Sequence, residues 1–336
     1  MTTYKEIKGT QIEVVASDPS NPVEGQVWYN STDQAVKGSA TTSVGAWASA
    51  PNMNTARANG GGSPAGNYQA ALFSGGYTGT TETGVVESYN GTSWTEVNDL
   101  NKARYDIGGA GTYTSALAFG GQPSGSPGAL LNNNESWNGT NWTEVNNLTT
   151  SVQQAGGVGA SNTSALAFGG HGPTPSGPSV ALTESWNGSN WTEVNDLNQA
   201  RGYLGGIGIA TAALGFGGSF FPGTTANTEL WNGTNWTEVN NLNVSKEGQR
   251  GAGNSGNTAG LCIGQNPTAP LGDTEEWNGT NWTEVNPLNT VRFNGRGTGT
   301  TSKALYYGGQ APPGRLVATE EWTAAGAAVT RTFTDS

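Results

Sequence analysis

The chain has 336 residues, of which 25 are acidic and 14 are basic, so its formal net charge is −11. Nucleic acids and anionic membrane surfaces select basic partners, and this balance therefore argues against both. Charged residues make up only 12% of the chain, while 53 residues are glycine and 12 are tryptophan, a composition typical of a turn-rich all-β protein and not of a disordered one.

The first 46 residues precede the repeated part of the chain and contain a β-prone run from Val27 to Asn30. We expect a β-hairpin there. The start of the chain lacks the apolar core of a secretory signal, and no stretch approaches the length of a membrane span. Neither signal-directed secretion nor membrane insertion is therefore expected. We assign residues 1–46 to attachment or to closure of the fold.

A nearly constant sequence motif dominates the rest of the chain. One copy runs from Glu135 to Asn146 and reads Glu-Ser-Trp-Asn-Gly-Thr-Asn-Trp-Thr-Glu-Val-Asn. A period in the forties indicates an array of identical supersecondary units. The last Trp of the motif recurs, at intervals of 45 to 49 residues, at Trp94, Trp142, Trp191, Trp236 and Trp282.

Each repeat predicts four short strands. In one repeat these are residues 142–145, a Gly-rich run at 155–160, an apolar run at 164–168 that ends in Gly-Gly, and residues 182–186. We expect the Gly-rich strand innermost, the apolar strand next and the Trp strands outermost. Asn-Gly between two aromatics predicts a hairpin, because both residues tolerate positive φ, and it brings the two Trp side chains near cross-strand register.

The number of repeats predicts the architecture. The apolar strand occurs six times, and its fifth copy has Gln265 in place of the second Gly. Trp47 begins a sixth outer strand before the first complete repeat, whereas the last repeat lacks one. We predict an all-β, six-bladed β-propeller of four-stranded blades, closed by the N-terminal strand. Seven blades are the alternative, with a hybrid blade from the N-terminal hairpin and residues 328–333. The predicted segments are 1–46, a propeller at 47–323 and a C-terminal strand or tail at 324–336.

Two resemblances follow from these motifs. The apolar run ending in Gly-Gly, a variable loop and two spaced aromatics resemble the kelch motif over residues 47–323. Residues 19–38 and the ending 329–335 are similar to segments of tail-fibre and virion proteins of marine bacteriophages, including those that infect cyanobacteria. This second resemblance implies a virion protein, made in the host cytoplasm, that contacts other virion or tail proteins through residues 1–46. It also implies an oligomer that meets a host cell-surface glycan or protein.

Enzymatic chemistry is not expected. Copper radical oxidases of the kelch type need a Tyr–Cys cross-link and His ligands, but this chain has one cysteine, Cys262, and one histidine, His171. The apolar run around Cys262 favours a buried, inert thiol. Glutamates such as Glu135 and Glu144 recur in every unit, so they are better explained as strand or turn partners than as an acid/base pair. We expect no cofactor and no metal.

One basic position opens the Gly-rich run in five of six copies, and the third copy has Val152 there. One interpretation is pairing with the repeated glutamates or with backbone carbonyls. The other is a basic ring that binds an anionic glycan or a peptide carboxylate. The five residues are Arg57, Arg104, Arg201, Lys246 and Arg292.

The loops after the Gly-Gly strand lie on the same predicted face and differ in every copy. Variable loops on a rigid scaffold are a common place for recognition, although drift in unconstrained loops is the alternative. We therefore predict a tail fibre or tail-associated adhesin that recognises the host surface. A structural or decorating virion protein and a lectin-like propeller unrelated to virions stay open. The contact-prone loop residues are Tyr77, His171, Phe220, Phe221 and Arg315.

Overall fold

The computed structural model shows an all-β protein. It describes residues 12–20, 25–41, 45–123, 129–172, 178–220, 222–254, 256–264, 273–326 and 328–332. These residues form strands and turns with no helix among them, so none of them supplies an apolar helix long enough to cross a bilayer. Contacts divide the chain into two compact units, Trp47–Trp322 and a unit that joins residues 1–46 to residues 323–336.

The unit that contains both chain ends is a single four-stranded sheet in the order β1-β2-β3-β32. The expected hairpin is present as β2 and β3, and the C-terminal strand pairs with β3. Trp28 is fully buried, and its indole N–H donates to Asp18 at 3.0 Å. A hydrogen bond from Asn30 is the main reason why the pKa of Asp18 falls to about 2. The strands are β1 (Glu13–Val15), β2 (Val27–Asn30), β3 (Ala35–Thr41) and β32 (Ala328–Thr332).

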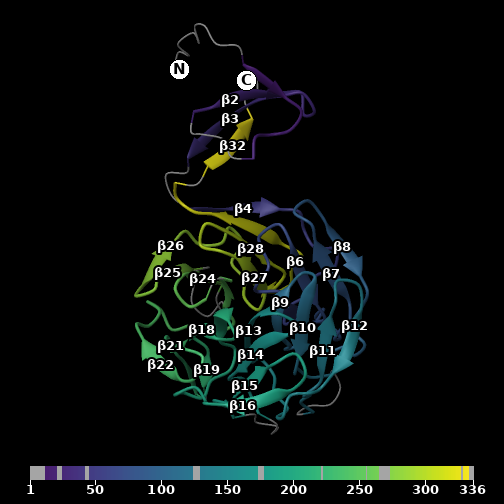
Figure 1. Ribbon diagram of the computed structural model, residues 1–336, viewed down its shortest axis with the longest axis vertical. Coiled ribbons are helices and arrows are strands. Elements are labelled where there is room, and N and C mark those ends of the chain that lie inside the picture. The colour runs from purple at the N-terminus through teal and green to yellow at the C-terminus, as the bar shows by residue number, and fades with distance from the viewer. Residues whose placement is uncertain are drawn as a thin grey trace. The chain divides into compact units, whose positions relative to one another are not determined.

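The larger unit contains six antiparallel four-stranded sheets, counted over the described residues, in a propeller-like arrangement (Figure 1). Numbered first to sixth and written from the Gly-rich strand outward, they are β5 (Gly61–Gly62), β6 (Ala71–Ser74), β7 (Val86–Tyr89), β8 (Trp94–Val97); β9 (Gly108–Thr112), β10 (Ser115–Phe119), β11 (Asn134–Trp137), β12 (Trp142–Val145); β13 (Gly156–Ser161), β14 (Ser164–Phe168), β15 (Thr183–Trp186), β16 (Trp191–Val194); β17 (Gly205–Ile209), β18 (Ala212–Phe216), β21 (Thr228–Trp231), β22 (Trp236–Val239); β23 (Arg250–Ala252), β24 (Gly260–Ile263), β25 (Thr274–Trp277), β26 (Trp282–Val285); β27 (Arg296–Gly299), β28 (Lys303–Tyr307), β31 (Thr319–Thr323), β4 (Ala46–Ala50). Two short hairpins, β19 (Ser219–Phe220) with β20 (Gly223–Thr224) and β29 (Gln310–Ala311) with β30 (Gly314–Arg315), extend from the loops.

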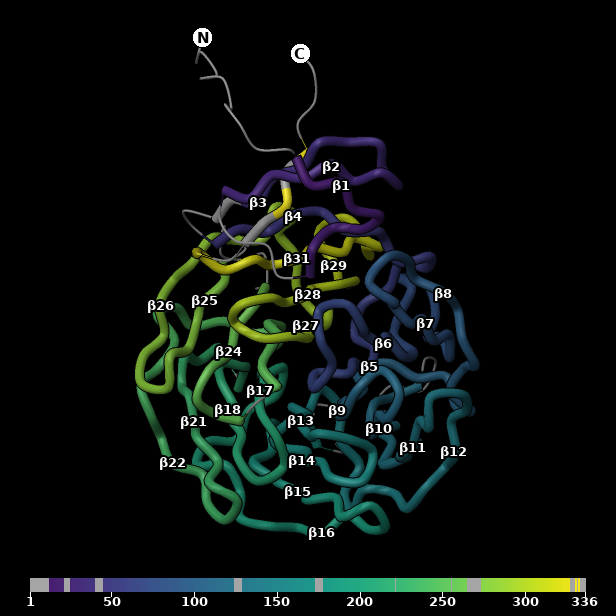
Figure 2. The backbone as a smooth tube through the Cα atoms, turned by 45° about the horizontal axis from the view of Figure 1, so that its top comes forward, coloured from purple at the N-terminus to yellow at the C-terminus, as the bar shows by residue number. Residues whose placement is uncertain are grey.

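The Gly-rich strands lie innermost (Figure 2), as the composition of the repeat predicts. They contact one another in the order β5, β9, β13, β17, β23 and β27, and β27 contacts β5 in turn. Glycine is required because the backbones approach closely. A Cβ on Gly109 would lie 2.4 Å from the Gly62 carbonyl oxygen, and one on Gly157 would lie 2.4 Å from the Gly109 oxygen.

The outer hairpins carry the repeated motif. Trp137 pairs directly with Trp142, and their ring centroids lie 5.3 Å apart, in agreement with the predicted register. Of the Asn-Gly pair, however, only Gly139 adopts positive φ. The side-chain oxygen of Asn138 instead accepts hydrogen bonds from the backbone amides of Thr140 and Asn141, each at 2.9 Å, because a short Asn side chain can cap a turn locally.

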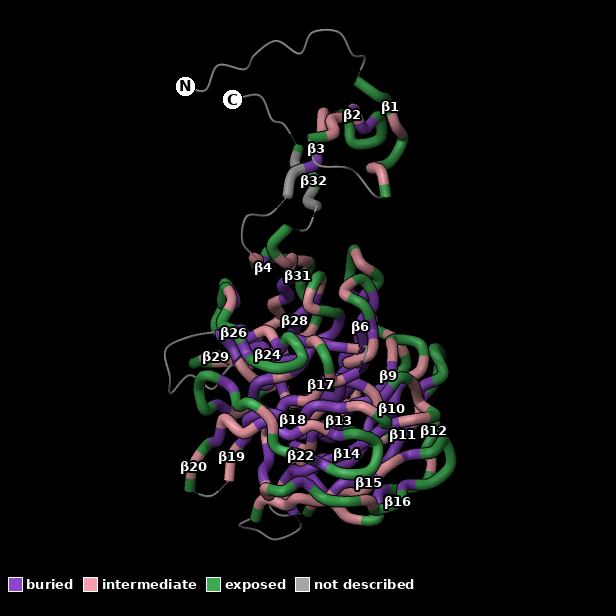
Figure 3. The backbone as a smooth tube through the Cα atoms, turned by 60° about the vertical axis from the view of Figure 1, so that its left-hand side comes forward, coloured by how far each residue is buried: buried purple, intermediate pink, exposed green. Residues whose placement is uncertain are grey.

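The sheets are joined side by side by apolar clusters and by buried hydrogen bonds. Phe119 of the second sheet packs against Trp191 of the third at 5.1 Å between centroids. Trp94 of the first sheet donates to Thr319 of the sixth at 3.1 Å, and Trp47 in β4 lies 5.5 Å from Trp322 in β31. Figure 3 shows buried segments inside this unit and exposed segments along its outer loops.

Candidate functional site

The five basic residues at the start of the Gly-rich runs are buried, and the structure pairs each of them with a repeated glutamate. Arg57, Arg104 and Arg292 have no exposed surface. This is the first of the two interpretations offered by the sequence, and it leaves no accessible cationic ring at these positions. The ion pairs are Arg57–Glu87, Arg104–Glu135, Arg201–Glu229 at 3.0 Å, Lys246–Glu275 at 2.6 Å and Arg292–Glu320.

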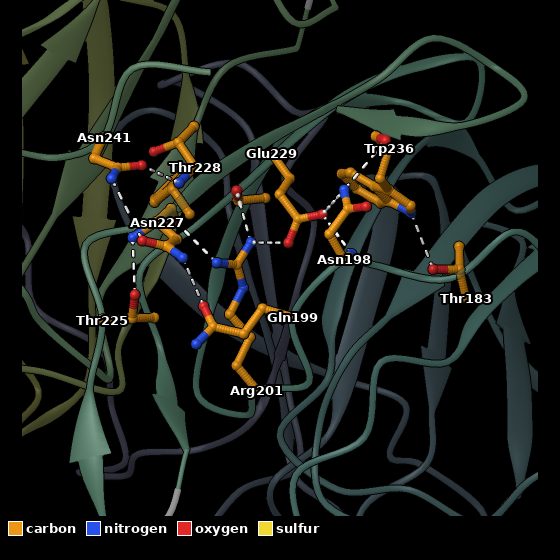
Figure 4. Close-up of polar contacts among 12 residues, drawn as sticks. Thr183, Asn198, Gln199, Arg201, Thr225, Asn227, Thr228, Glu229, Trp236 and Asn241 are labelled. Atoms are coloured by element: carbon orange, nitrogen blue, oxygen red, sulfur yellow. Dashed lines mark hydrogen bonds and ion pairs between the residues drawn. The ribbon is translucent and has the colours of Figure 1, made fainter. Parts of the chain in front are cut away.

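Each glutamate is the centre of a network of hydrogen bonds and an ion pair, shown for the fourth sheet in Figure 4. Glu229 accepts from the backbone N–H and the side chain of Asn198 at 2.7 and 2.8 Å. Arg201 also donates to the Asn227 carbonyl at 3.0 Å. Hydrogen bonds to the remaining atoms of a buried ion pair offset part of its desolvation cost, and this network supplies several of them, although Nε of Arg201 has no hydrogen-bond partner. These residues therefore hold the sheet together and are not part of the proposed binding site.

The third sheet lacks this ion pair. Val152 replaces the basic residue, and the carboxylate of Glu184 accepts hydrogen bonds from the backbone amides of Thr149 and Thr150, at 2.8 and 3.2 Å. A cavity of about 10 Å³, lined by Val152 and Glu184 among others, lies at this place. Comparison with the other copies therefore indicates that a basic side chain at position 152 would fill this cavity.

On the face that carries the variable loops, six residues in the left-handed backbone region connect the sheets. Backbone hydrogen bonds run between successive members, for example from Gln154 to Asp106 at 2.9 Å and from Asn59 to Asn294 at 3.0 Å. Non-glycine residues adopt positive φ rarely, and such strain often accompanies function. With φ between 54° and 74°, the six residues are Asn59, Asp106, Gln154, Tyr203, Gly248 and Asn294.

A pocket of about 190 Å³ lies beside these residues, and we call it the mouth pocket. Gln310 in β29 and Arg315 in β30 pair directly across their hairpin and form one wall. Three buried polar atoms in the lining have no hydrogen-bond partner: Oδ1 of Asn59, Oε1 of Gln310 and Nε of Arg315. The full lining is Asn59, Tyr203, Glu247, Gly248, Phe293, Asn294, Gln310 and Arg315.

The loop residues that the sequence predicted to contact a ligand differ in how they lie relative to the mouth pocket. The guanidinium of Arg315 lies 5.2 Å from the ring centroid of Tyr77, which in turn packs 5.1 Å from Tyr105. The His171 ring lies 5.6 Å from that of Tyr203. Tyr77 and His171 thus each touch a neighbour of the mouth, and Arg315 lines it. Phe220 is half-buried in β19, and Phe221 lies outside the described residues.

The innermost strands enclose a second, smaller space, which we call the channel cavity. It has a volume of about 40 Å³ and is lined by glycines from all six inner strands. Beside these glycines the lining includes Pro64, Ala155 and Leu204 and two charged residues, Arg250 and Arg296. Nearby, the carboxyl of Asp106 is buried, and this burial raises its pKa to about 6.

The remaining chemistry of the described residues is limited. Cys262 is a free, buried thiol, and burial raises its pKa to about 12, which matches the inert role expected from its sequence. In the described ranges, no group of three or more His, Cys, Asp or Glu residues is placed to hold a metal ion.

The sequence prediction missed most of the mouth pocket. Tyr203, Glu247, Phe293 and Asn294 follow the basic position by one or two residues, where the copies differ as much as in the loops. Alignment of the Gly-rich runs would also have shown Arg250 and Arg296 as departures from glycine. Neither a scan of protein-family models nor a search of curated proteins finds a match for this chain.

Proposed function

We propose that this chain is a non-enzymatic bacteriophage virion protein, a tail fibre or tail-associated adhesin, that recognises the host surface with its repeat-built unit. The similarity of residues 19–38 and 329–335 to marine-phage virion proteins supports the location. In this proposal residues 1–46 contact other virion proteins, and oligomerisation makes weak binding multivalent.

In the same proposal the six sheets are the blades of a closed, kelch-like six-bladed propeller. The placement of β4 beside β31 supports closure, as do the hydrogen bonds from Trp94 to Thr319 and from Asn59 to Asn294. A closed propeller presents its variable loops as one rigid face, which favours recognition because little ordering is needed on binding.

The observation that carries the binding proposal is the mouth pocket. Buried polar atoms are nearly always hydrogen-bonded, and an unpaired one needs an explanation. Here two acceptors and one donor, on Asn59, Gln310 and Arg315, line one pocket. Sugar hydroxyls both donate and accept, and the rings of Tyr203 and Phe293 add apolar surface. A cell-surface glycan is therefore the ligand class that the pocket suits best.

Binding of the purified, labelled full chain to cyanobacterial cells and their envelope polysaccharides tests the proposal. We expect saturable binding that Arg315→Ala and Tyr203→Ala each weaken by about tenfold, since each change removes a hydrogen bond or ring contact. Thr143→Ala, on an exposed outer strand, is the matched control and should bind normally. Absence of binding to every cell and fraction would contradict the proposal.

Immunogold labelling of virions separates the alternatives. Label at the tail supports an adhesin, whereas label on the capsid without cell binding supports a decorating protein. Glycan binding by a protein absent from virions would support a lectin-like propeller instead.

A further inference from the structure

Two neighbouring copies of the repeat depart from glycine at one position of the innermost strand. The first residue of β23 is Arg250 and that of β27 is Arg296. The other four inner strands begin with glycine, at Gly61, Gly108, Gly156 and Gly205.

The residue opposite this position differs between the copies, and for Arg250 it explains why an arginine fits. Gly108 and Gly205 pair with Phe119 and Phe216, and a Cβ at either glycine would lie 2.1 or 2.3 Å from the ring. The aromatic ring occupies the space there. Arg250 instead pairs with Ile263, which leaves that space to the arginine side chain. Arg296 pairs with Tyr307, whose hydroxyl donates to a backbone carbonyl at 3.2 Å.

Both arginines line the channel cavity, and their guanidinium groups donate to neutral acceptors. Arg296 reaches the Ile107 carbonyl of the second sheet at 2.8 Å, and Arg250 donates to the Gln249 carbonyl at 2.8 Å. No ion pair between described residues includes either side chain. This differs from the basic position of the same sheets, where every cation has its own glutamate.

The electrostatics of the cavity favour an added negative charge. Burial lowers the pKa of Arg250, and burial together with repulsion from Arg250 lowers the pKa of Arg296 to about 9. Guanidinium groups stay protonated in proteins. Among the described residues, Asp106 is the carboxyl whose charge acts on both, beside the phenol of Tyr306, and its Oδ1 has no hydrogen-bond partner. Two cations therefore share one carboxyl, whose burial raises its pKa to about 6.

We propose that Arg250 and Arg296 form an anion site in the channel cavity that takes the carboxylate of a small acid or of an acidic sugar. A cavity of about 40 Å³ exceeds the roughly 10–15 Å³ that one water needs and suits a three-atom carboxylate. Planar guanidinium groups bind carboxylates through paired hydrogen bonds. The side chain of Asn294 accepts a hydrogen bond from Arg250 at 3.5 Å and also lines the mouth pocket. Asn294 therefore lies between the anion site and an acidic sugar bound in the mouth pocket.

The anion site is tested with the full chain by titration calorimetry and thermal unfolding in acetate, glucuronate and glucose at constant ionic strength. We expect wild type to bind acetate and glucuronate. Arg250→Met and Arg296→Met, which keep the aliphatic stem, should weaken acetate binding by on the order of tenfold or more. Arg250→Gly combined with Ile263→Phe recreates the Gly–Phe pair of three other sheets and should show the same loss in a folded protein.

Arg315→Met, in the mouth pocket, is the control that separates this inference from the proposed host recognition, and it should bind acetate as wild type does. Tighter binding of glucuronate than of acetate identifies an acidic sugar as the source of the carboxylate, and equal binding identifies a small acid. No acetate binding by wild type, or equal binding by wild type and the folded Arg250 variants, would overturn the anion site even if glucose still binds.

Discussion

The outer hairpins and the mouth of the propeller-like unit differ in how closely the copies of the repeat agree. In the hairpins, Asn146 donates to Ser189 and Asn190 of the next sheet, at 3.0 and 2.8 Å, and the equivalent contact recurs from copy to copy. At the mouth the copies differ, apart from Asn59 and Asn294 at equivalent positions, and Asn59 and Gln310 carry unpaired buried oxygens. Unpaired buried atoms also occur in the repeated motif, for example Nε1 of Trp142, so it is the variation between copies at the mouth that marks where ligand recognition is expected.

The largest expected effect breaks the repeated network. Glu135→Ala leaves Arg104 buried without its carboxylate and should lower the free energy of unfolding by about 3–5 kcal/mol. Glu144, the residue directly across the hairpin, is exposed, and Glu144→Ala should change stability little. Urea unfolding of both variants measures the difference. Equal losses would show that the pairing is not what distinguishes the repeated core.

The pH dependence of stability tests Asp106, one of the six positive-φ residues on the face that carries the variable loops. Burial raises the pKa of Asp106 from 3.8 to about 6, so between these values the folded state holds a proton that the unfolded state has lost. Stability from this group is present at low pH and falls by about 3 kcal/mol as the pH rises through about 6. Unfolding of wild type and Asp106→Asn from pH 4 to 7 isolates the effect. Parallel curves for the two proteins would exclude it.

Close packing of the inner strands predicts the next largest effect on stability. Gly109→Ala places a methyl group 2.4 Å from the Gly62 oxygen and 2.6 Å from its nitrogen, so one sheet must shift against the other. We expect a loss of about 1–3 kcal/mol. Gly314→Ala is the control, because a Cβ there meets nothing within 4 Å. A normal thermal midpoint for Gly109→Ala would mean that the inner strands lie farther apart than described.

The smallest effect repairs the copy that lacks its ion pair. Val152→Arg should fill the cavity beside Glu184 and raise the free energy of unfolding by about 1 kcal/mol, the usual net contribution of a buried hydrogen bond. Val152→Met fills space without charge and should gain less. If the Arg variant is less stable than the Met variant in urea, the third sheet is adapted to the absence of the cation.

The period of the motif predicted the arrangement of the strands well, because each repeat has its own Gly, Pro and Asn residues at the turns between strands. The motif placed the strand beginning at Trp47 before the first complete repeat, as an outer strand. In the structure this strand, β4, lies next to β31 in the sixth sheet. The burial of Arg104 against Glu135 depends on contacts between elements 31 residues apart, so the sequence left two interpretations open. The positive φ of Tyr203 could not be expected, since a bulky residue rarely adopts it and only the hydrogen bonds between sheets impose it.

Hydrogen exchange of the full chain with and without a bound envelope glycan tests most directly whether the unpaired mouth, and not the repeated hairpins, is the binding surface. The account predicts slower exchange in peptides that contain Tyr203, Asn294 and Arg315, and unchanged exchange in the hairpin turns such as the one at Gly139. Protection confined to the hairpin turns, with the mouth peptides unchanged, would contradict it.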